Sequence, residues 1–141
     1  MVCGLNKGSF MKWFLAFWLA VASCFSVGLH ANDAVLQQAY QSQQSDLQAQ
    51  GFGQVVKVLP DDNDGSRHQK FILKLNSGQT LLVAHNIDLA PRIPSLKVGD
   101  SVEFYGEYEW NKKGGVLHWT HKDPQNRHEH GWLKHNGQVY E

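Results

Sequence analysis

The chain contains very little cysteine, and this absence excludes several kinds of site and scaffold. Its two cysteines are Cys3 and Cys24, and both lie in the N-terminal segment that precedes the first polar stretch. The rest of the sequence, from Asn32 onward, contains no cysteine. That part of the chain therefore has no disulfide, no thiol nucleophile and no cysteinyl zinc site. Small exported domains often depend on disulfides, so this fold must instead be held by its hydrophobic core.

The chain also lacks an excess of charge of either sign. Its 13 basic and 13 acidic side chains give a formal net charge of +0 at pH 7 over 141 residues. Bulk electrostatic capture of nucleic acid normally needs a clear basic excess, so only a local basic groove remains open. The length indicates one small domain.

Several well-known motifs are missing as well. No Walker loop or dinucleotide fingerprint is present, and no serine lies in a nucleophile elbow. The stretch DDNDG resembles a calcium loop, but Pro60 and Phe71 occupy positions one and twelve, where side-chain ligands are needed. We therefore predict a turn there.

One apolar run stands near the N-terminus, and it is short for a membrane span. It extends from Trp13 to about Val27 after Lys12, which is typical of a signal-peptide core. We predict a signal peptide over residues 1–31, with cleavage after Ala31. The protein is then periplasmic or secreted, and it contacts the membrane only through this segment.

Three alternatives stay open for this segment. The sequence VASC, which ends at Cys24, resembles a lipobox and would make the protein a lipoprotein. An uncleaved anchor is the second alternative. Translation can start at Met1 or at Met11, because the residues between them add little to the pattern.

The polar segment that follows predicts one N-terminal amphipathic helix over residues 32–50. Asn32 or Asp33 can cap it, and apolar residues recur at helical spacing among glutamines. Gly51 and Gly53 are expected to end the helix.

From residue 51 the apolar period changes to two, which predicts a mainly β domain over residues 51–141. The predicted strands are GQVVKVLP, RHQKFILKL, QTLLVAHN, SVEFYGEYEW and VLHWTH. A hairpin is predicted around Asn136-Gly137. Short strands separated by turns favour a small OB-like barrel, with an SH3-like barrel or a small sandwich as alternatives.

Four stretches carry a family resemblance: VLPDDNDGSRHQKFIL, AHNIDLAPRIP, FYGEYEWNKKGGVLHWTHKDP and GWLKHNGQVY. They resemble a family of small exported bacterial proteins of unknown function. The resemblance covers nearly all of the chain after the targeting segment. It implies an autonomous exported domain and assigns no activity or catalytic residue.

The stretch from His118 to His135 holds five of the eight histidines and predicts two kinds of site. Zinc or another divalent transition metal accepts such ligands, and the proposed set is His118, His121, Asp123 and His128. In a strand His118 and His121 would point to opposite faces, so their convergence needs a bulge or a strand end near Thr120. The alternative is a surface of polar histidines.

The loop after the third predicted strand is a second region of interest. His85 lies close in sequence to Asp88 and Arg92, so a histidine–carboxylate pair could orient water while Arg92 or Arg67 holds an anion. Alternatively, Asp88 and Asn86 cap the turn and Arg92 pairs with a surface carboxylate.

Aromatic side chains gather in the last third of the sequence, and Trp110 and Trp119 are the proposed ligand contacts. Such residues stack on nucleobases or sugar rings, although a small domain also needs aromatics in its core. The proposed ligand-binding set is His85, Asp88, Arg92, Trp110, His118, Trp119 and His121.

These patterns favour an exported OB-like binding module for a small or oligomeric ligand, such as nucleic acid or glycan, over an enzyme. The first alternative is a metal-dependent hydrolase acting on phosphodiesters. The second is a structural or pH-sensing envelope domain, whose clustered histidines would weaken the region when protonated between about pH 7 and 5.

Overall fold

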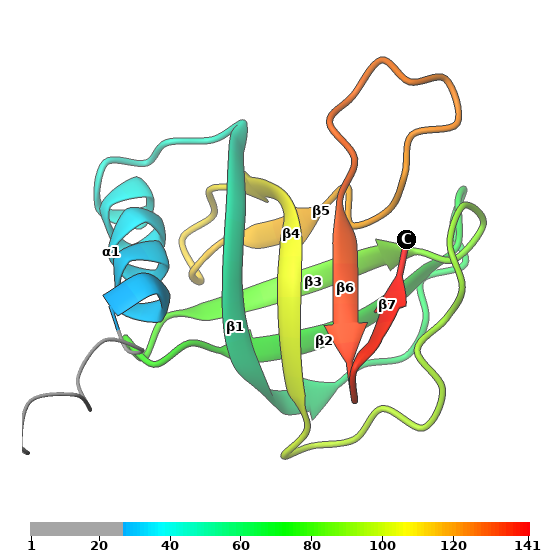
Figure 1. Cartoon of the computed structure of the whole chain (residues 1–141), viewed down its shortest axis with the longest axis horizontal. Helices are drawn as coiled ribbons and strands as arrows, with labels where there is room; N and C mark the ends of the chain where they lie inside the picture. Colours follow the sequence, from blue (N-terminus) through cyan, green and yellow to red (C-terminus); the bar gives the residue numbers. More distant parts are fainter. Residues whose placement is uncertain (1–26) are drawn as a thin grey trace, which may run out of the picture.

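The computed structural model describes residues 27–141 as one helix and seven strands (Figure 1). The elements are α1 (Val27–Gln41), β1 (Leu47–Val58), β2 (His68–Lys74), β3 (Thr80–Asn86), β4 (Ser101–Glu109), β5 (Val116–His118), β6 (Trp132–His135) and β7 (Gln138–Tyr140). The predicted signal-peptide core, Cys24 and both start residues lie outside the described residues. Within the described part, no helix is long and apolar enough to cross a membrane.

Five of the strands close into a barrel, which confirms the predicted OB-like architecture. Hydrogen-bonded neighbours follow the order β1-β2-β3-β5-β4, and β1 pairs with β4 as well, so the ring closes. The β3–β5 pairing is parallel and the other pairings of the ring are antiparallel. Closure removes most free strand edges, which stabilises a small barrel without disulfides.

The two-residue period of the strands fills the barrel interior. In β2 and β3 every second residue is buried, and the largest fully buried side chains include Tyr108, Phe71 and Phe104. Leu36 and Ala39 of α1 belong to the same core, so the helix packs against the barrel as Figure 1 shows. One face of the amphipathic helix is thereby buried.

The prediction that the helix continues to residue 50 is wrong. The helix begins at Val27, five residues before Asn32, and ends at Gln41. Gln43 adopts a left-handed φ of 55°, and the Gln44 amide donates to the carbonyl of Ala39 at 2.9 Å. The Gln43 amide also donates to the carbonyl of Tyr40, at 3.3 Å. The two bonds satisfy carbonyls at the helix end in the manner of a Schellman motif.

The residues that follow belong to β1, because they pair with β4 from Leu47 to Gln54. Gly51 and Gly53 therefore lie inside a strand and do not end the helix. A Cβ atom on Gly51 would lie 2.6 Å from the ring of Phe104. This glycine lets the strand pass close to a core aromatic side chain.

The predicted C-terminal hairpin is present and extends the sheet beyond the barrel. Asn136 and Gly137 have φ values of 50° and 78°, as a type I′ turn requires. β6 pairs with residues 103–105 of β4, on the same edge where β5 pairs with residues 107–109. His135 is buried, and its Nε2 lies 2.9 Å from Asp100 Oδ2, which ties the hairpin to the start of β4.

Candidate functional site

The outer surface of β2, β3 and β5 forms an elongated face with an apolar middle. Ile72 pairs with Leu82, and Leu82 pairs with Val116, so these side chains form one row across the strands. All three are only partly buried, because alternate strand residues point away from the core. Lys70 and Lys74 lie on the same side of β2, before and after Ile72. The face thus combines an apolar row with basic side chains.

A hollow of about 230 Å³ lies at one end of this face. Its lining residues come from β2, β3 and the segment around the end of β5: Ser66, His68, Ala84, Asn86, Leu89, His118, Trp119 and His121. Three residues of the predicted ligand-binding set, His118, Trp119 and His121, therefore meet here.

Two histidines of the hollow are held in a defined tautomer by the main chain. Nδ1 of His68 lies 2.8 Å from the carbonyl oxygen of Ser66, and Nδ1 of His121 lies 2.7 Å from that of Lys122. A carbonyl oxygen only accepts, so each Nδ1 carries the proton and donates. In the neutral ring Nε2 is then an acceptor.

Trp119 has an unusual backbone and two imidazole neighbours. Its φ is 52°, in the left-handed region that bulky residues rarely adopt. Its ring stacks on His128 with centroids 3.9 Å apart and planes at 8°, and it lies 5.3 Å from the ring of His121. The left-handed residue ends β5 and turns the chain, so the expected strand continues no further than His118.

The loop between Trp119 and β6 is organised by Asp123. Its carboxylate accepts from the backbone amides of Gln125, Arg127 and His128 at 2.8–2.9 Å. These amides hold the pKa of Asp123 below its usual value. Both carboxylate oxygens are thus occupied, so Asp123 shapes the loop and is poorly suited to hold a metal.

His128 lies between two acceptors, which favours its protonated form. Its Nδ1 is 2.8 Å from the carbonyl of Glu129, and its Nε2 is 2.8 Å from Oε2 of Glu107. Burial lowers the pKa of His128, but these two acceptors outweigh it and the net direction is upward. Protonation therefore strengthens this contact.

The expected metal set is not the one that the fold gathers. Among the described residues, one group of three such side chains has its ligand atoms within 4.8 Å of one another, and it consists of Glu107, Glu109 and His118. His118 thus faces two carboxylates of β4, whereas His121 lines the hollow and His128 bonds to Glu107.

Sequence reasoning missed both glutamates, although a signal for them exists. Along β4 the buried residues alternate with Glu103, Tyr105, Glu107 and Glu109. The turn after β4 sets an antiparallel register in which Glu107 pairs with His118. Fixing that register from the NKKGG turn would have placed a carboxylate opposite the histidine.

His85 of the predicted set lies in the core, away from any ligand. It is fully buried, its Nε2 lies 3.0 Å from the carbonyl of Pro91, and its Nδ1 lies 2.8 Å from the hydroxyl of Thr120. The carbonyl fixes the proton on Nε2, so Thr120 donates to Nδ1. Burial lowers the pKa of His85 to about 4. His85 is thus a neutral structural residue.

The charged residues near His85 in sequence form ion pairs elsewhere on the surface. Asp88 Oδ1 lies 2.7 Å from Nε of Arg67, and the backbone amide of Arg67 also donates to this carboxylate. Arg92 pairs with Asp61. Each of these arginines therefore already has a carboxylate partner, and the alternative interpretation of this loop expected that of Arg92.

Trp110 serves the core as well. Its indole Nε1 donates to the carbonyl of Tyr40 at 3.0 Å, and its ring packs against the hydrophobic core. Its backbone amide donates to the hydroxyl of Ser45. The side chain therefore fastens the end of α1 and lies apart from the hollow at Trp119.

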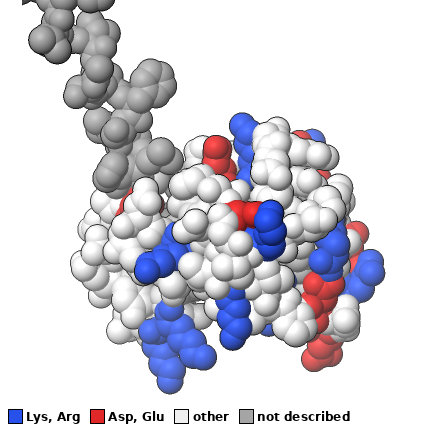
Figure 2. Space-filling model, turned by 90° about the horizontal axis from the view of Figure 1, so that it is seen from below, with Lys and Arg blue, Asp and Glu red and all other residues white. Residues whose placement is uncertain are grey.

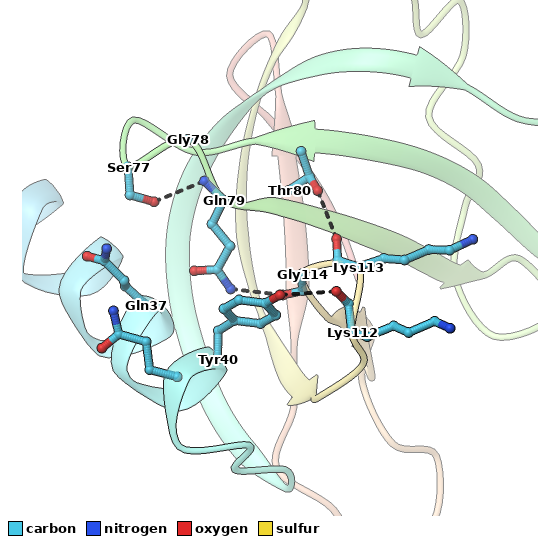
Figure 3. Close-up of a pocket in the computed structure, with 10 residues that line it drawn as sticks. Gln37, Tyr40, Ser77, Gly78, Gln79, Thr80, Lys112, Lys113 and Gly114 are labelled. Atoms are coloured by element: carbon cyan, nitrogen blue, oxygen red, sulfur yellow. Dashed lines mark hydrogen bonds between the residues drawn. The ribbon is translucent and has the colours of Figure 1, made fainter.

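A second hollow, of about 390 Å³, lies between α1 and two turns. Tyr40 donates to the carbonyl of Lys112, Thr80 to that of Lys113, and Gln79 to that of Gly114. Figure 3 shows these bonds crossing the hollow, with the two lysine side chains extending away from it. The polar groups that line this hollow bond α1 and the turns to one another, so we assign them a structural role and no ligand.

Comparison with known proteins supplies a family and no activity. No curated protein matches the chain. A family model described as "protein of unknown function (DUF3465)" matches residues 19–141, which confirms the predicted membership of a family of unknown function. The chain, with its closed barrel and its histidine- and tryptophan-lined hollow, belongs to this family.

Proposed function

We propose that the protein is an exported OB-like binding module that holds a short anionic oligomer along the outer face of β2, β3 and β5. The hollow at Trp119 would receive a terminal ring of the ligand. Outer barrel faces centred on the second and third strands are the surfaces that OB folds use for oligonucleotides and oligosaccharides. The observation that carries the proposal is the continuity of the apolar row, the lysines and this hollow.

The basic character of the face comes from lysines that no carboxylate neutralises. Within residues 27–141, Lys70, Lys74, Lys112 and Lys113 make no ion pair, whereas Lys97 pairs with Asp100. Figure 2 likewise shows groups of basic side chains without acidic neighbours, although the net charge is zero. Such lysines attract phosphates or carboxylates.

Two of these lysines lie at the same end of the face. Lys74 pairs with Thr80 across β2 and β3, and Thr80 donates to the carbonyl of Lys113. The opposite end of the face carries His68 and Asn86, which pair across the same strands and line the hollow. A seven-residue strand spans roughly 20 Å, which accommodates an oligomer of a few units.

The hollow supports recognition of a ring. Trp119 lines the hollow with a ring that stacks on His128, and His68 and His121 line it with imidazole rings whose orientation the main chain fixes. Stacking of a base on an aromatic side chain contributes about 1–3 kcal/mol. A sugar ring stacks on tryptophan through the same apolar contact, so the shared requirement is a planar or ring-shaped unit with hydroxyl or amide donors.

Fluorescence anisotropy tests the proposal. The untagged protein is titrated into a labelled short single-stranded oligonucleotide and, separately, into a labelled oligogalacturonate, at several salt concentrations. We expect saturable binding to one of them that weakens as salt rises, because lysines replace released counterions. Trp119→Ala should weaken this binding at least about tenfold, which corresponds to about 1.4 kcal/mol.

Matched lysine variants separate the face from general charge. Lys70→Gln combined with Lys74→Gln should weaken binding and flatten its salt dependence. Lys97→Gln, which removes a lysine already paired with Asp100, should leave both unchanged. Absence of saturable binding to either oligomer, or equal losses in the two lysine variants, would contradict the proposal.

Export is part of this proposal and rests on the apolar segment from Trp13 to about Val27. Mass spectrometry after expression in a bacterium with a periplasm tests it. A periplasmic chain that begins at Asn32 supports a cleaved signal peptide. A lipid-modified Cys24 would instead establish a lipoprotein, and an intact chain in the cytoplasm would overturn export.

A further inference from the structure

We infer that Glu107, Glu109 and His118 form a binding site for a divalent transition metal ion such as zinc. This site differs from the set that the histidine spacing predicts, and it does not require the proposed oligomer. One imidazole nitrogen and two carboxylate oxygens lie within 4.8 Å of one another. Zinc is bound by this combination of nitrogen and oxygen ligands in proteins.

The state of His118 Nε2 is a second observation that points to a cation. The Nε2 atom is shielded from solvent, although the His118 side chain is 33% exposed, and it makes no hydrogen bond of good geometry within the described residues. It lies 3.3 Å from Oε1 of Glu109 and 3.7 Å from Oε2 of Glu107. Two carboxylates that face one ring nitrogen need a positively charged or hydrogen-bonding group between them, and no well-aligned hydrogen bond joins these atoms in the described residues. A metal ion between the three groups would supply the charge that His118 and Glu109 lack as partners, while Glu107 also keeps its bond to His128.

The backbone holds these ligands in register. Glu107 pairs with His118, and Glu109 pairs with Val116, in the antiparallel β4–β5 ladder. Ligands on paired strands are positioned more precisely than ligands on loops. The three side chains are partly exposed, with Glu109 the most open at 45%, so an ion can enter from solvent.

A neighbouring histidine supports one of the ligands. Nε2 of His128 lies 2.8 Å from Oε2 of Glu107, and the His128 ring stacks on Trp119. Residues that hydrogen-bond to a ligating carboxylate orient it and tune its affinity for metal. The ring of His118 also lines the hollow at Trp119, so a bound ion would lie beside the proposed ligand site.

Three protein ligands leave a zinc ion with at least one open coordination position. Structural zinc sites usually have four protein ligands, whereas sites with three keep a position for water or another molecule. The site therefore fits an exchangeable ion that a bound ligand can contact directly.

Calorimetric titration tests the inference with metal ions alone. The full chain, without a polyhistidine tag and after treatment with a chelator, is titrated with zinc. We expect one ion per chain with a dissociation constant in the micromolar range or below. Glu109→Gln should weaken binding at least tenfold, and it should remove the rise in melting temperature that zinc produces in the unaltered protein.

Two control variants decide between this site and other histidine surfaces. Glu103→Gln alters an exposed carboxylate on the same side of β4 and should bind zinc as the unaltered protein does. His121→Gln should also leave the affinity unchanged, because His121 lies outside the group of three. Absence of stoichiometric binding overturns the inference, as does an equal loss in Glu103→Gln and Glu109→Gln. Since no oligomer is present, either result leaves the proposed function standing.

Discussion

Trp110 and Trp119 stand at opposite ends of the β4–β5 hairpin, and the fold uses them in opposite ways. Trp110 follows the end of β4, donates its indole N–H to Tyr40 and packs on the core. Trp119 follows the end of β5, has a left-handed backbone and stacks on His128 beside a hollow. The first tryptophan is fixed by tertiary packing, whereas the second is held in a strained conformation next to a surface cavity.

This difference shows what distinguishes a tryptophan that packs in the core from one that lies beside a surface hollow. Strained backbone persists only where the surrounding structure imposes it, and it is concentrated at functional sites. At Trp119 it is imposed by a loop that Asp123 ties to its own amides and that Gly131 joins to the carbonyl of His121. Residue type alone does not separate the two roles; the partners of each side chain do.

The largest expected effect on stability comes from replacing Trp110, the tryptophan that packs on the core. Trp110→Ala should lower the free energy of unfolding by about 3 kcal/mol, because it removes buried ring surface and a hydrogen bond. Trp110→Phe keeps most of the packing and should cost about 1 kcal/mol. Urea denaturation measures both. Oligomer affinity of the folded variants should be unchanged, and a loss of affinity in Trp110→Phe would break the comparison.

The second prediction concerns His85 in the barrel interior and the pH dependence of the free energy of unfolding. Burial lowers the pKa of His85 to about 4, below the ordinary value of 6.5. Between these values the unfolded chain binds a proton that the folded protein excludes. The free energy of unfolding should therefore fall as pH decreases from 6.5 to 4, by on the order of 3 kcal/mol.

The matched variant for this prediction is His85→Gln, which can still bond to Thr120 and to the carbonyl of Pro91. Urea denaturation at several pH values should show a shallower fall for the variant, since the other titrating groups are common to both proteins. Parallel profiles would show that His85 is not the buried neutral group described above.

Much of the fold follows from local pattern. The two-residue period located the strands from β2 to β4, and Asn136-Gly137 located the last hairpin. The start of β1 was not predicted, because residues 47–50 continue a glutamine-rich helical pattern and become a strand only by pairing with β4. That pairing joins segments about fifty residues apart, and single-sequence periodicity carries no information about it.

The candidate site was predictable in part for a related reason. The histidine-rich stretch indicated His118, Trp119 and His121, which do meet in the hollow. It could not reveal that the carboxylate of Asp123 would accept hydrogen bonds from backbone amides, or that the side chain of His85 would point into the barrel core. Those outcomes depend on the loop's own hydrogen bonds and on the parity of β3, which one residue of shift would invert.

The third prediction concerns how closely the loop between Trp119 and β6 packs against the backbone of Trp119. A Cβ atom on Gly131 would lie 1.9 Å from the carbonyl oxygen of Trp119. Gly131→Ala should therefore force the loop away from Trp119 and lower the free energy of unfolding by about 2 kcal/mol. Gly137→Ala is the control, because within the described residues no heavy atom other than those of its chain neighbours lies within 4 Å of its Cβ position. The control should cost about 1 kcal/mol, since alanine replaces a glycine at positive φ. Equal losses would show that the contact with Trp119 is not constraining.

The smallest expected effect tests the strain at Trp119 directly. Trp119→Ala and Trp119→Gly remove the same stack on His128, but glycine tolerates a φ of 52° and alanine does not. The glycine variant should therefore be more stable than the alanine variant by about 1 kcal/mol. At Trp110, whose φ is not positive, the order should be reversed, because glycine raises the entropy of the unfolded chain. Urea denaturation of the four variants measures both differences. The same order at both positions would mean that the left-handed backbone of Trp119 does not persist in solution, and the two ends of the hairpin would then differ only in burial.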